Sequence, residues 1–276
     1  MSRFTLASSA AVLATACLVA EAAAQTAASP PDFSSNQAAW QTPNGTDYIA
    51  VPGSPPLIAN DAAHPYISNG VAIRTGQQPT YRIADLTNPN LKQWAKDVMK
   101  KDNDEVLKGK IGFTPSSSCK QPGVPAAWLA GGPFFFIQTP KEVLIVEEGD
   151  RHARRIHMDV QHSANPKPSW YGESVGHYEG DTLVVDTIGF NTKTFVDNYR
   201  TPHSDKLHVV ERYHVIDGGK TLEVRFRVED PETFNQPWEA IRRFNKTQAT
   251  LGEEICQEGN FTLFDYGIPV AKTADF

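Results

Sequence analysis

The sequence predicts a mainly β protein, an antiparallel meander that closes into a lipocalin-like barrel or a β-sandwich, with one N-terminal helix and an irregular N-terminal arm. From Phe134 onward, short runs of β-branched and aromatic residues alternate with Gly, Pro and Asp. Gly180-Asp181 and Asp217-Gly218-Gly219 each separate two such runs, as hairpin turns do. Closing the sheet, or stacking two sheets, would protect the edges of these consecutive hairpins.

Residues 1–24 have the pattern of a secretory signal peptide. Arg3 gives a positive start, residues 4–20 form an apolar run, and small residues lead up to Ala24. The run is broken by Ser and Thr and is shorter than the roughly 20 residues of a spanning helix. We therefore expect cleavage near Ala24, a periplasmic or secreted protein, and no membrane span.

Charge and cysteine content narrow the partners and the compartment. The formal net charge is −6, and no stripe of Lys and Arg is present, which argues against a nucleic-acid partner. Cleavage would leave two cysteines, Cys119 and Cys256. An isolated pair in an oxidising compartment predicts a disulfide, worth roughly 4–5 kcal/mol in the chain-entropy model.

The chain divides into the signal, an irregular arm at 25–87, and a helix plus an antiparallel β domain at 88–276. The arm is rich in Pro, Ala, Asn, Gly and Ser and shows neither helical nor strand periodicity. A helix is predicted over 90–108, with Asn88 as its cap and Pro89 at its first position. Its apolar stripe consists of Leu91, Trp94, Ala95, Val98 and Met99.

The strand pattern then runs to the end of the chain. The predicted strands before the central region are 134–139, 142–148 and 153–160, and two hairpins follow at 174–188 and 207–229. Residues 238–244 and 260–264 are predicted to close the sheet.

The second hairpin places a carboxylate on an apolar face. Either two-residue turn within 217–219 puts Leu222, Val224, Phe226 and Val228 on the face of Leu207, Val209, Tyr213 and Val215. Glu211 lies on that face, while His208 and His214 lie on the opposite one. Two interpretations of Glu211 stay open: a general acid or base inside a cavity, or a glutamate paired with a structural Arg or placed near the barrel mouth.

Two further histidines are candidate catalytic groups. In the first hairpin, His177 pairs opposite Val184, with Asp186 on the same side, an arrangement that can orient an imidazole. A structural histidine is the alternative. The polar loop 190–206 presents His203 and Arg200 as residues of a site mouth.

The sequence lacks the standard cofactor motifs. Phosphate-loop and dinucleotide fingerprints are absent, and so are C-x-x-C and H-E-x-x-H. His152, His157 and His162 are five residues apart, so on a strand they would alternate between faces. No metal ligands are assigned and no organic cofactor is expected, although a histidine-ligated metal ion stays an alternative.

Four segments carry a resemblance: CKQPGVP (119–125), ESVGHYEGDTLVVDTIGFN (173–191), PHSDKLHVVERY (202–213) and VEDPETFNQPW (228–238). With these segments the chain resembles a family of secreted bacterial proteins of unknown function. The resemblance implies one domain over 119–264 and a periplasmic or secreted location. It implies no activity and no catalytic residue.

Together these features favour a periplasmic or secreted enzyme that performs cofactor-independent proton transfer, as a lyase, hydratase or isomerase. Its substrate would be a small, partly apolar or aromatic molecule. The expected catalytic residues are Glu211, His177, Asp186 and His203. The expected ligand-binding residues are Tyr213, Phe226, Phe135, Trp170 and Arg200. The alternatives are a non-catalytic lipocalin-like binding protein and a metal-dependent enzyme.

Overall fold

The computed structural model describes residues 30–34, 38–43, 47–149, 153–253 and 256. The predicted signal at 1–24 and the predicted strand at 260–264 lie outside the described residues.

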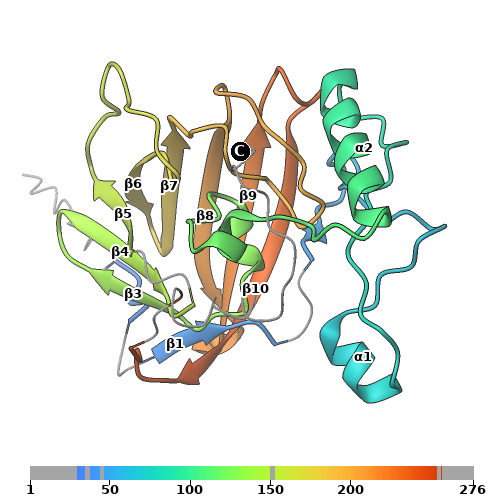
Figure 1. The fold of residues 1–276 in the computed structure, drawn as a ribbon. Coiled ribbons are helices and arrows are strands. Elements are labelled where there is room, and N and C mark those ends of the chain that lie inside the picture. The colour runs from blue at the N-terminus through green and yellow to red at the C-terminus, as the bar shows by residue number, and fades with distance from the viewer. Residues whose placement is uncertain (1–29, 35–37, 44–46, 150–152, 254–255, 257–276) are drawn as a thin grey trace, which may run out of the picture.

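Ten strands form one sheet in the described chain. They are β1 (Ala38–Gln41), β2 (Ile49–Ala50), β3 (Phe134–Gln138), β4 (Glu142–Glu147), β5 (Ala153–Met158), β6 (Glu173–Glu179), β7 (Thr182–Ile188), β8 (His208–Ile216), β9 (Thr221–Glu229) and β10 (Trp238–Gln248). Figure 1 shows them wrapping around a common interior.

The sheet closes into a mixed nine-stranded barrel, which confirms the predicted barrel and excludes the sandwich. The closing strand is β1, which pairs with β3 through Trp40 and Phe134 and with the far end of β10 through Ala38 and Gln248. This strand comes from the arm predicted to be irregular. Its four residues are too few for a sequence period to stand out, and the barrel edges on both sides supply its hydrogen bonds.

The hairpin registers follow the predicted turns. Glu179 pairs with Thr182 across Gly180-Asp181, and His177 pairs with Val184 as expected. The second hairpin pairs Ile216 with Thr221, so its loop has four residues and the predicted faces are kept. One pair departs from an antiparallel meander: β5 and β6 are parallel, because the 159–172 loop returns the chain to the end where β5 begins.

The barrel interior is packed with aromatic rings. A 3-10 turn, η3 (Ala126–Leu129), inserts Trp128 among Phe134, Tyr213 and Phe244, with ring centroids 5.0–5.6 Å from its own. Each such edge-to-face or tilted pair adds about 0.5–1.5 kcal/mol beyond the area that it buries. The centre of the barrel is therefore a core, and a ligand site has to be sought at its ends.

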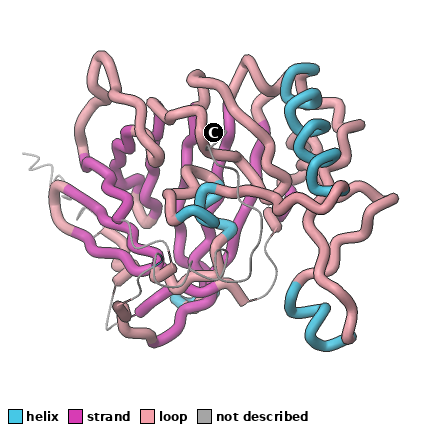
Figure 2. Tube along the Cα trace, in the orientation of Figure 1, coloured by secondary structure: helices cyan, strands magenta, loops and turns pink. Residues whose placement is uncertain are grey.

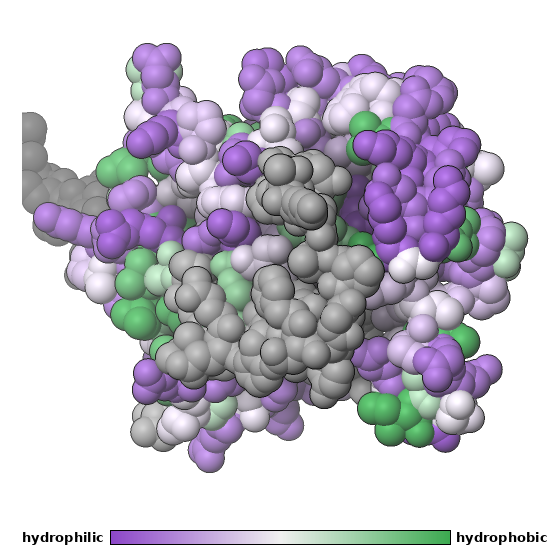
Figure 3. Space-filling view, in the orientation of Figure 1, coloured by the Kyte–Doolittle hydropathy of each residue, from purple (hydrophilic) through white to green (hydrophobic). Residues whose placement is uncertain are grey.

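Two α-helices of the described chain lie to one side of the barrel, among the long loops (Figures 1 and 2). Helix α2 (Gln93–Leu107) starts later than predicted, with Lys92 as its N-cap in place of Asn88. It buries Ala95, Met99, Asn103 and Val106, while Trp94 and Val98 of the predicted stripe are exposed. Its visible outer face is hydrophilic (Figure 3).

Helix α1 (Asn69–Thr75) was not predicted, because its seven residues make less than two helical turns and are too few to show an apolar stripe. Its boundaries nonetheless carry the usual signals. The Ser68 hydroxyl accepts a hydrogen bond from the Val71 amide, and Gly76 ends the helix in the left-handed conformation.

The predicted disulfide between Cys119 and Cys256 is confirmed, with the two Cα atoms 5.8 Å apart. It ties the segment that follows η2 (Pro115–Ser118) to the chain beyond β10. None of the described helices has the length and apolar character needed to cross a membrane.

Candidate functional site

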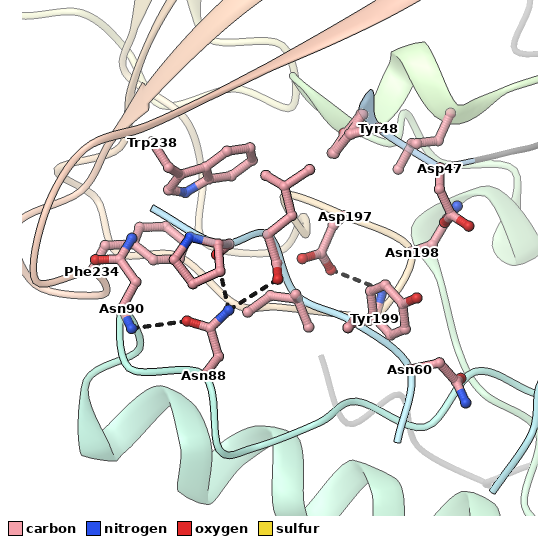
Figure 4. Close-up of a pocket in the computed structure, with 15 residues that line it drawn as sticks. Asp47, Tyr48, Asn60, Asn88, Asn90, Asp197, Asn198, Tyr199, Phe234 and Trp238 are labelled. Carbon is pink, nitrogen blue, oxygen red and sulfur yellow. Dashed lines mark hydrogen bonds between the residues drawn. The ribbon is translucent and has the colours of Figure 1, made fainter. Parts of the chain in front are cut away.

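A pocket of about 230 Å³ lies at one end of the barrel, and we refer to it as the barrel-end pocket. The β7–β8 and β9–β10 connections leave the barrel at this end, and the arm, the 88–90 segment before α2 and η3 supply the remaining walls (Figure 4). The lining residues are Asp47, Tyr48, Pro56, Leu57, Ile58, Ala59, Asn60, Asn88, Asn90, Leu129, Asp197, Asn198, Tyr199, Phe234 and Trp238.

The floor of the barrel-end pocket is aromatic. Trp238, the first residue of β10, packs edge-on against Phe234 and Phe226, with centroids 5.8 and 6.0 Å away. Tyr48 packs edge-on against Phe226 at 4.8 Å, and its hydroxyl donates to the Val196 carbonyl over 2.9 Å. Burial raises the pKa of the Tyr48 hydroxyl well above its ordinary value, so Tyr48 is a neutral donor.

Three asparagines brace the walls. Asn88 Nδ2 donates to the carbonyls of Pro56 and Leu57 over 3.0 and 3.1 Å. Asn90 exchanges two 2.9 Å hydrogen bonds with the backbone of Gln236. Asn60 donates to the carbonyls of Asp61 and His64 and accepts from the Ile83 amide. These amides therefore fix separate chain segments around the pocket, and most of their hydrogen-bonding capacity is used in doing so.

Asp197 presents a carboxyl group to the pocket (Figure 4). Its oxygens accept from the Tyr199 amide at 2.8 Å, the Thr201 amide at 3.1 Å and the Thr201 hydroxyl at 2.7 Å. Within the described chain it forms no ion pair, because Arg200 bonds to Asp102 and to the Arg82 carbonyl. Burial raises the pKa of the Asp197 carboxyl, against the hydrogen bonds from Thr201 and Tyr199 that lower it.

Trp238 carries an unsatisfied polar group. Its residue is 5% exposed, and Nε1 is the one buried side-chain polar atom without a hydrogen-bond partner in the described part of the chain. Buried donors are nearly always paired, so an unpaired indole N–H in a pocket wall is unusual.

Glu211 lies inside the barrel, on the predicted face, and is fully buried. Its carboxylate faces the Arg154 guanidinium in a bidentate pair and accepts from Trp128 Nε1 at 2.6 Å and the Tyr213 hydroxyl at 3.0 Å. Burial opposes the charge on Arg154, but the facing Glu211 raises the pKa of that guanidinium above its ordinary value. This is the arrangement of the structural alternative, a glutamate paired with an Arg.

His177 and Asp186 lie on the outer side of the barrel wall, opposite to Glu211. His177 is half exposed and contacts Glu179 at 3.1 Å rather than Asp186. Asp186 instead receives two other histidines, His162 at 2.9 Å and His208 at 3.0 Å. The structure therefore does not bring His177 and Glu211 into one pocket.

His203 is 3% exposed and is enclosed by the β7–β8 loop. Its Nδ1 lies 2.8 Å from the Ser204 carbonyl, which can only accept, so Nδ1 donates and Nε2 accepts from the Thr194 hydroxyl at 2.7 Å. Burial lowers the pKa of this imidazole. His203 is thus a neutral residue that holds the loop and does not line the barrel-end pocket.

The five expected ligand-binding residues are dispersed. Tyr213 and Phe226 point into the barrel, and Phe226 lies beneath the pocket floor. Phe135 is half-buried between the inward-facing Phe134 and Phe136, hence on the outer side of β3. Trp170 lies half-buried in the 159–172 loop, away from the pocket lining. Arg200 is 4% exposed and clamps α2 to the arm through Asp102 and the Arg82 carbonyl.

No group of three His, Cys, Asp or Glu side chains in the described ranges is arranged to hold a metal ion. The Nε2 atoms of His162 and His208 both contact the same carboxylate oxygen, Oδ1 of Asp186.

The pocket residues could not be predicted as a group from the sequence, because seven of the fifteen come from the non-periodic arm. One signal was available: the 88–90 segment Asn-Pro-Asn and the Asp197-Asn198-Tyr199 segment combine polar side chains with turn geometry. Asp197, Asn198 and Tyr199 precede Arg200 in a loop already singled out for binding. The sequence does not show which loops meet around the pocket, because their meeting depends on barrel closure.

Comparison of the chain with family models, with curated proteins and with solved structures finds no match.

Proposed function

We propose that this chain is a small-molecule-binding protein of the periplasm or extracellular space and that the barrel-end pocket is its ligand site. The observed barrel fold is suited to ligand binding at one of its ends. The disulfide suits an oxidising compartment, and the resemblance to secreted bacterial proteins supports the same location.

The observation that carries the proposal is the preformed pocket itself. Its walls come from five separate chain segments, 47–60, 88–90, 129, 197–199 and 234–238, and Asn60, Asn88 and Asn90 brace them through hydrogen bonds to backbone groups. Rigid apolar walls with a few placed polar groups are the usual features of small-molecule sites.

Among the described residues, the space around Glu211 in the barrel interior is already filled. Glu211 is enclosed by Arg154, Trp128 and Tyr213, and those three partners fill the space around its carboxylate. A ligand would have to displace a buried ion pair from its partners, which costs several kcal/mol.

The pocket volume limits the ligand to a compact molecule. At about 230 Å³, the pocket is small for a ligand site. It is below the ~300 Å³ lower end for typical ligand pockets, so one small ring with a short substituent is the size that fits.

A pocket-filling substitution tests the proposal. Ile58 is half-buried in the pocket wall, and Ile58→Trp would occupy the space with an indole. Ile137→Trp is the matched control, since Ile137 is 50% exposed on β3 outside the pocket. We expect compounds that raise the melting temperature of wild type to lose this effect in Ile58→Trp and keep it in Ile137→Trp. Hits that stabilise both variants equally would refute the assignment.

A second candidate function is proton-transfer catalysis in the same pocket, with Asp197 as the acid or base. The raised pKa of the Asp197 carboxyl favours it, because a carboxyl group in an apolar pocket is tuned toward neutral pH. In that case Asp197→Asn would abolish turnover of a bound substrate while leaving its affinity within a few-fold of wild type.

A further inference from the structure

We infer that the barrel-end pocket takes a small organic cation, a molecule with an ammonium group on a compact apolar body. This inference rests on the proposed function and adds the chemical class of the ligand.

The charges around the pocket favour a cation. The lining includes two carboxylates, Asp47 and Asp197, and no Lys, Arg or His. Asp47 is already paired with Arg82, whose guanidinium lies 3.0 Å from its carboxylate. Arg82 is further held by the Tyr199 hydroxyl at 3.2 Å and by the face of Tyr66 at 4.0 Å. Asp197 forms no such close ion pair with any Lys, Arg or His of the described residues, and the more distant Arg200, which is bonded to Asp102, is the cation that acts on it.

Asp197 is also held ready for a ligand. Three hydrogen bonds from Tyr199 and Thr201 fix both carboxylate oxygens. Two carboxylate oxygens can accept about four hydrogen bonds, so one acceptor position stays open. A ligand ammonium at this position would form a charge-assisted hydrogen bond, which is roughly twice as strong as a neutral one.

The rings of the pocket suit the same ligand. Tyr48, Tyr199, Phe234 and Trp238 all line it, so a cation bound to Asp197 would share the pocket with four aromatic side chains (Figure 4). The rings of Tyr48 and Trp238 are neighbours in the lining, with centroids 6.2 Å apart. The negative faces of aromatic rings attract ammonium groups, and this attraction grows when water is excluded.

The test compares benzylammonium with benzyl alcohol, a neutral molecule of nearly the same shape. Isothermal titration calorimetry at neutral pH is expected to show wild type binding benzylammonium about tenfold or more tightly than benzyl alcohol, as one charge-assisted bond implies. Asp197→Asn should lose this preference and keep its affinity for benzyl alcohol. Asp186→Asn removes a half-exposed carboxylate on the outer wall and should behave like wild type.

The experiment distinguishes failure of the cation assignment from failure of the proposed ligand site. If benzyl alcohol binds as tightly as benzylammonium, the cation assignment is refuted while the pocket stands as a ligand site. If neither probe binds at about 10 mM, the cation assignment is also refuted, and the Ile58→Trp comparison decides the proposed function alone.

Should Asp197→Asn fail to fold, the pH dependence of wild type gives the same answer. Affinity for benzylammonium should fall as acid protonates Asp197, while affinity for benzyl alcohol stays constant. Parallel curves for the two probes would overturn the inference.

Discussion

Arg154 and Glu211 face each other inside the barrel as a bidentate ion pair whose side chains are 4% and 0% exposed. The pair joins β5 to β8 across the interior, and Trp128 and Tyr213 complete the hydrogen bonding of the carboxylate. This buried pair fixes β5 relative to β8, and the hydrogen bond to Glu211 holds Trp128 in the interior. Because its partners enclose it, the Glu211 carboxylate has no open side for a substrate.

Breaking this pair should destabilise the protein strongly. Glu211→Leu leaves the Arg154 guanidinium buried without its partner, and we expect a loss of about 3–5 kcal/mol in the free energy of unfolding. The double variant Arg154→Met/Glu211→Leu should recover most of that loss, because two apolar side chains replace two charges. Urea denaturation of the three proteins measures both effects, and equal stabilities of the single and double variants would contradict this role.

The outer-wall contact between His208 and Asp186 should make stability depend on pH. The hydrogen bond that His208 donates to the Asp186 carboxylate raises the pKa of His208 and lowers the pKa of Asp186. Stabilisation by His208 is therefore complete below its ordinary pKa and lost as the pH rises through the raised value. Stabilisation by Asp186 is present above its ordinary pKa and lost as the pH falls through the lowered value.

Asp186→Asn should remove both effects and return the pKa of His208 toward its ordinary value, as followed by the imidazole proton shifts in NMR titrations. Because both groups are a third or more exposed, the change in stability should stay below about 1 kcal/mol. An unchanged His208 titration in this variant would show that Asp186 is not its partner in solution.

The asparagines that brace the pocket walls should affect the local stability of those walls without affecting that of the barrel. Asn88→Ala removes the hydrogen bonds to the Pro56 and Leu57 carbonyls, so hydrogen exchange at the amides of 57–59 should speed up while β8 and β9 stay protected. Asn103→Ala is the control, since Asn103 clamps α2 to Ala84. If Asn103→Ala accelerates exchange at 57–59 as much as Asn88→Ala does, Asn88 is not the specific brace.

Much of the barrel could be predicted from the sequence, because the facing of residues in a hairpin depends only on its own turn. The turns at Gly180-Asp181 and Asp217 to Gly219 fix which residues share a face, and this placed Glu211 inside. Its partners were not predictable, because Trp128 and Arg154 lie 83 and 57 residues away and meet it only when the barrel closes. Phe135 was placed inside because a run of three phenylalanines has no alternation to show which one points outward.

The candidate site was less predictable than the fold. Asp197 lies in a loop of the predicted β region, but its neighbours Leu57 and Ile58 come from an arm without periodicity. Their approach is set by Asn88 and by the closing of β1 on β10, both of which are long-range contacts.

The tryptophans provide the most direct test of where ligands bind. The chain has five, of which Trp238 lines the barrel-end pocket and Trp128 donates to Glu211 in the barrel interior. Fluorine NMR of protein labelled with 5-fluorotryptophan, titrated with benzylammonium, reads both positions in one experiment. The pocket assignment predicts a saturable shift of the Trp238 resonance with Trp128 unchanged. A saturable shift of Trp128 with Trp238 unchanged would place the ligand beside Glu211 and contradict the account.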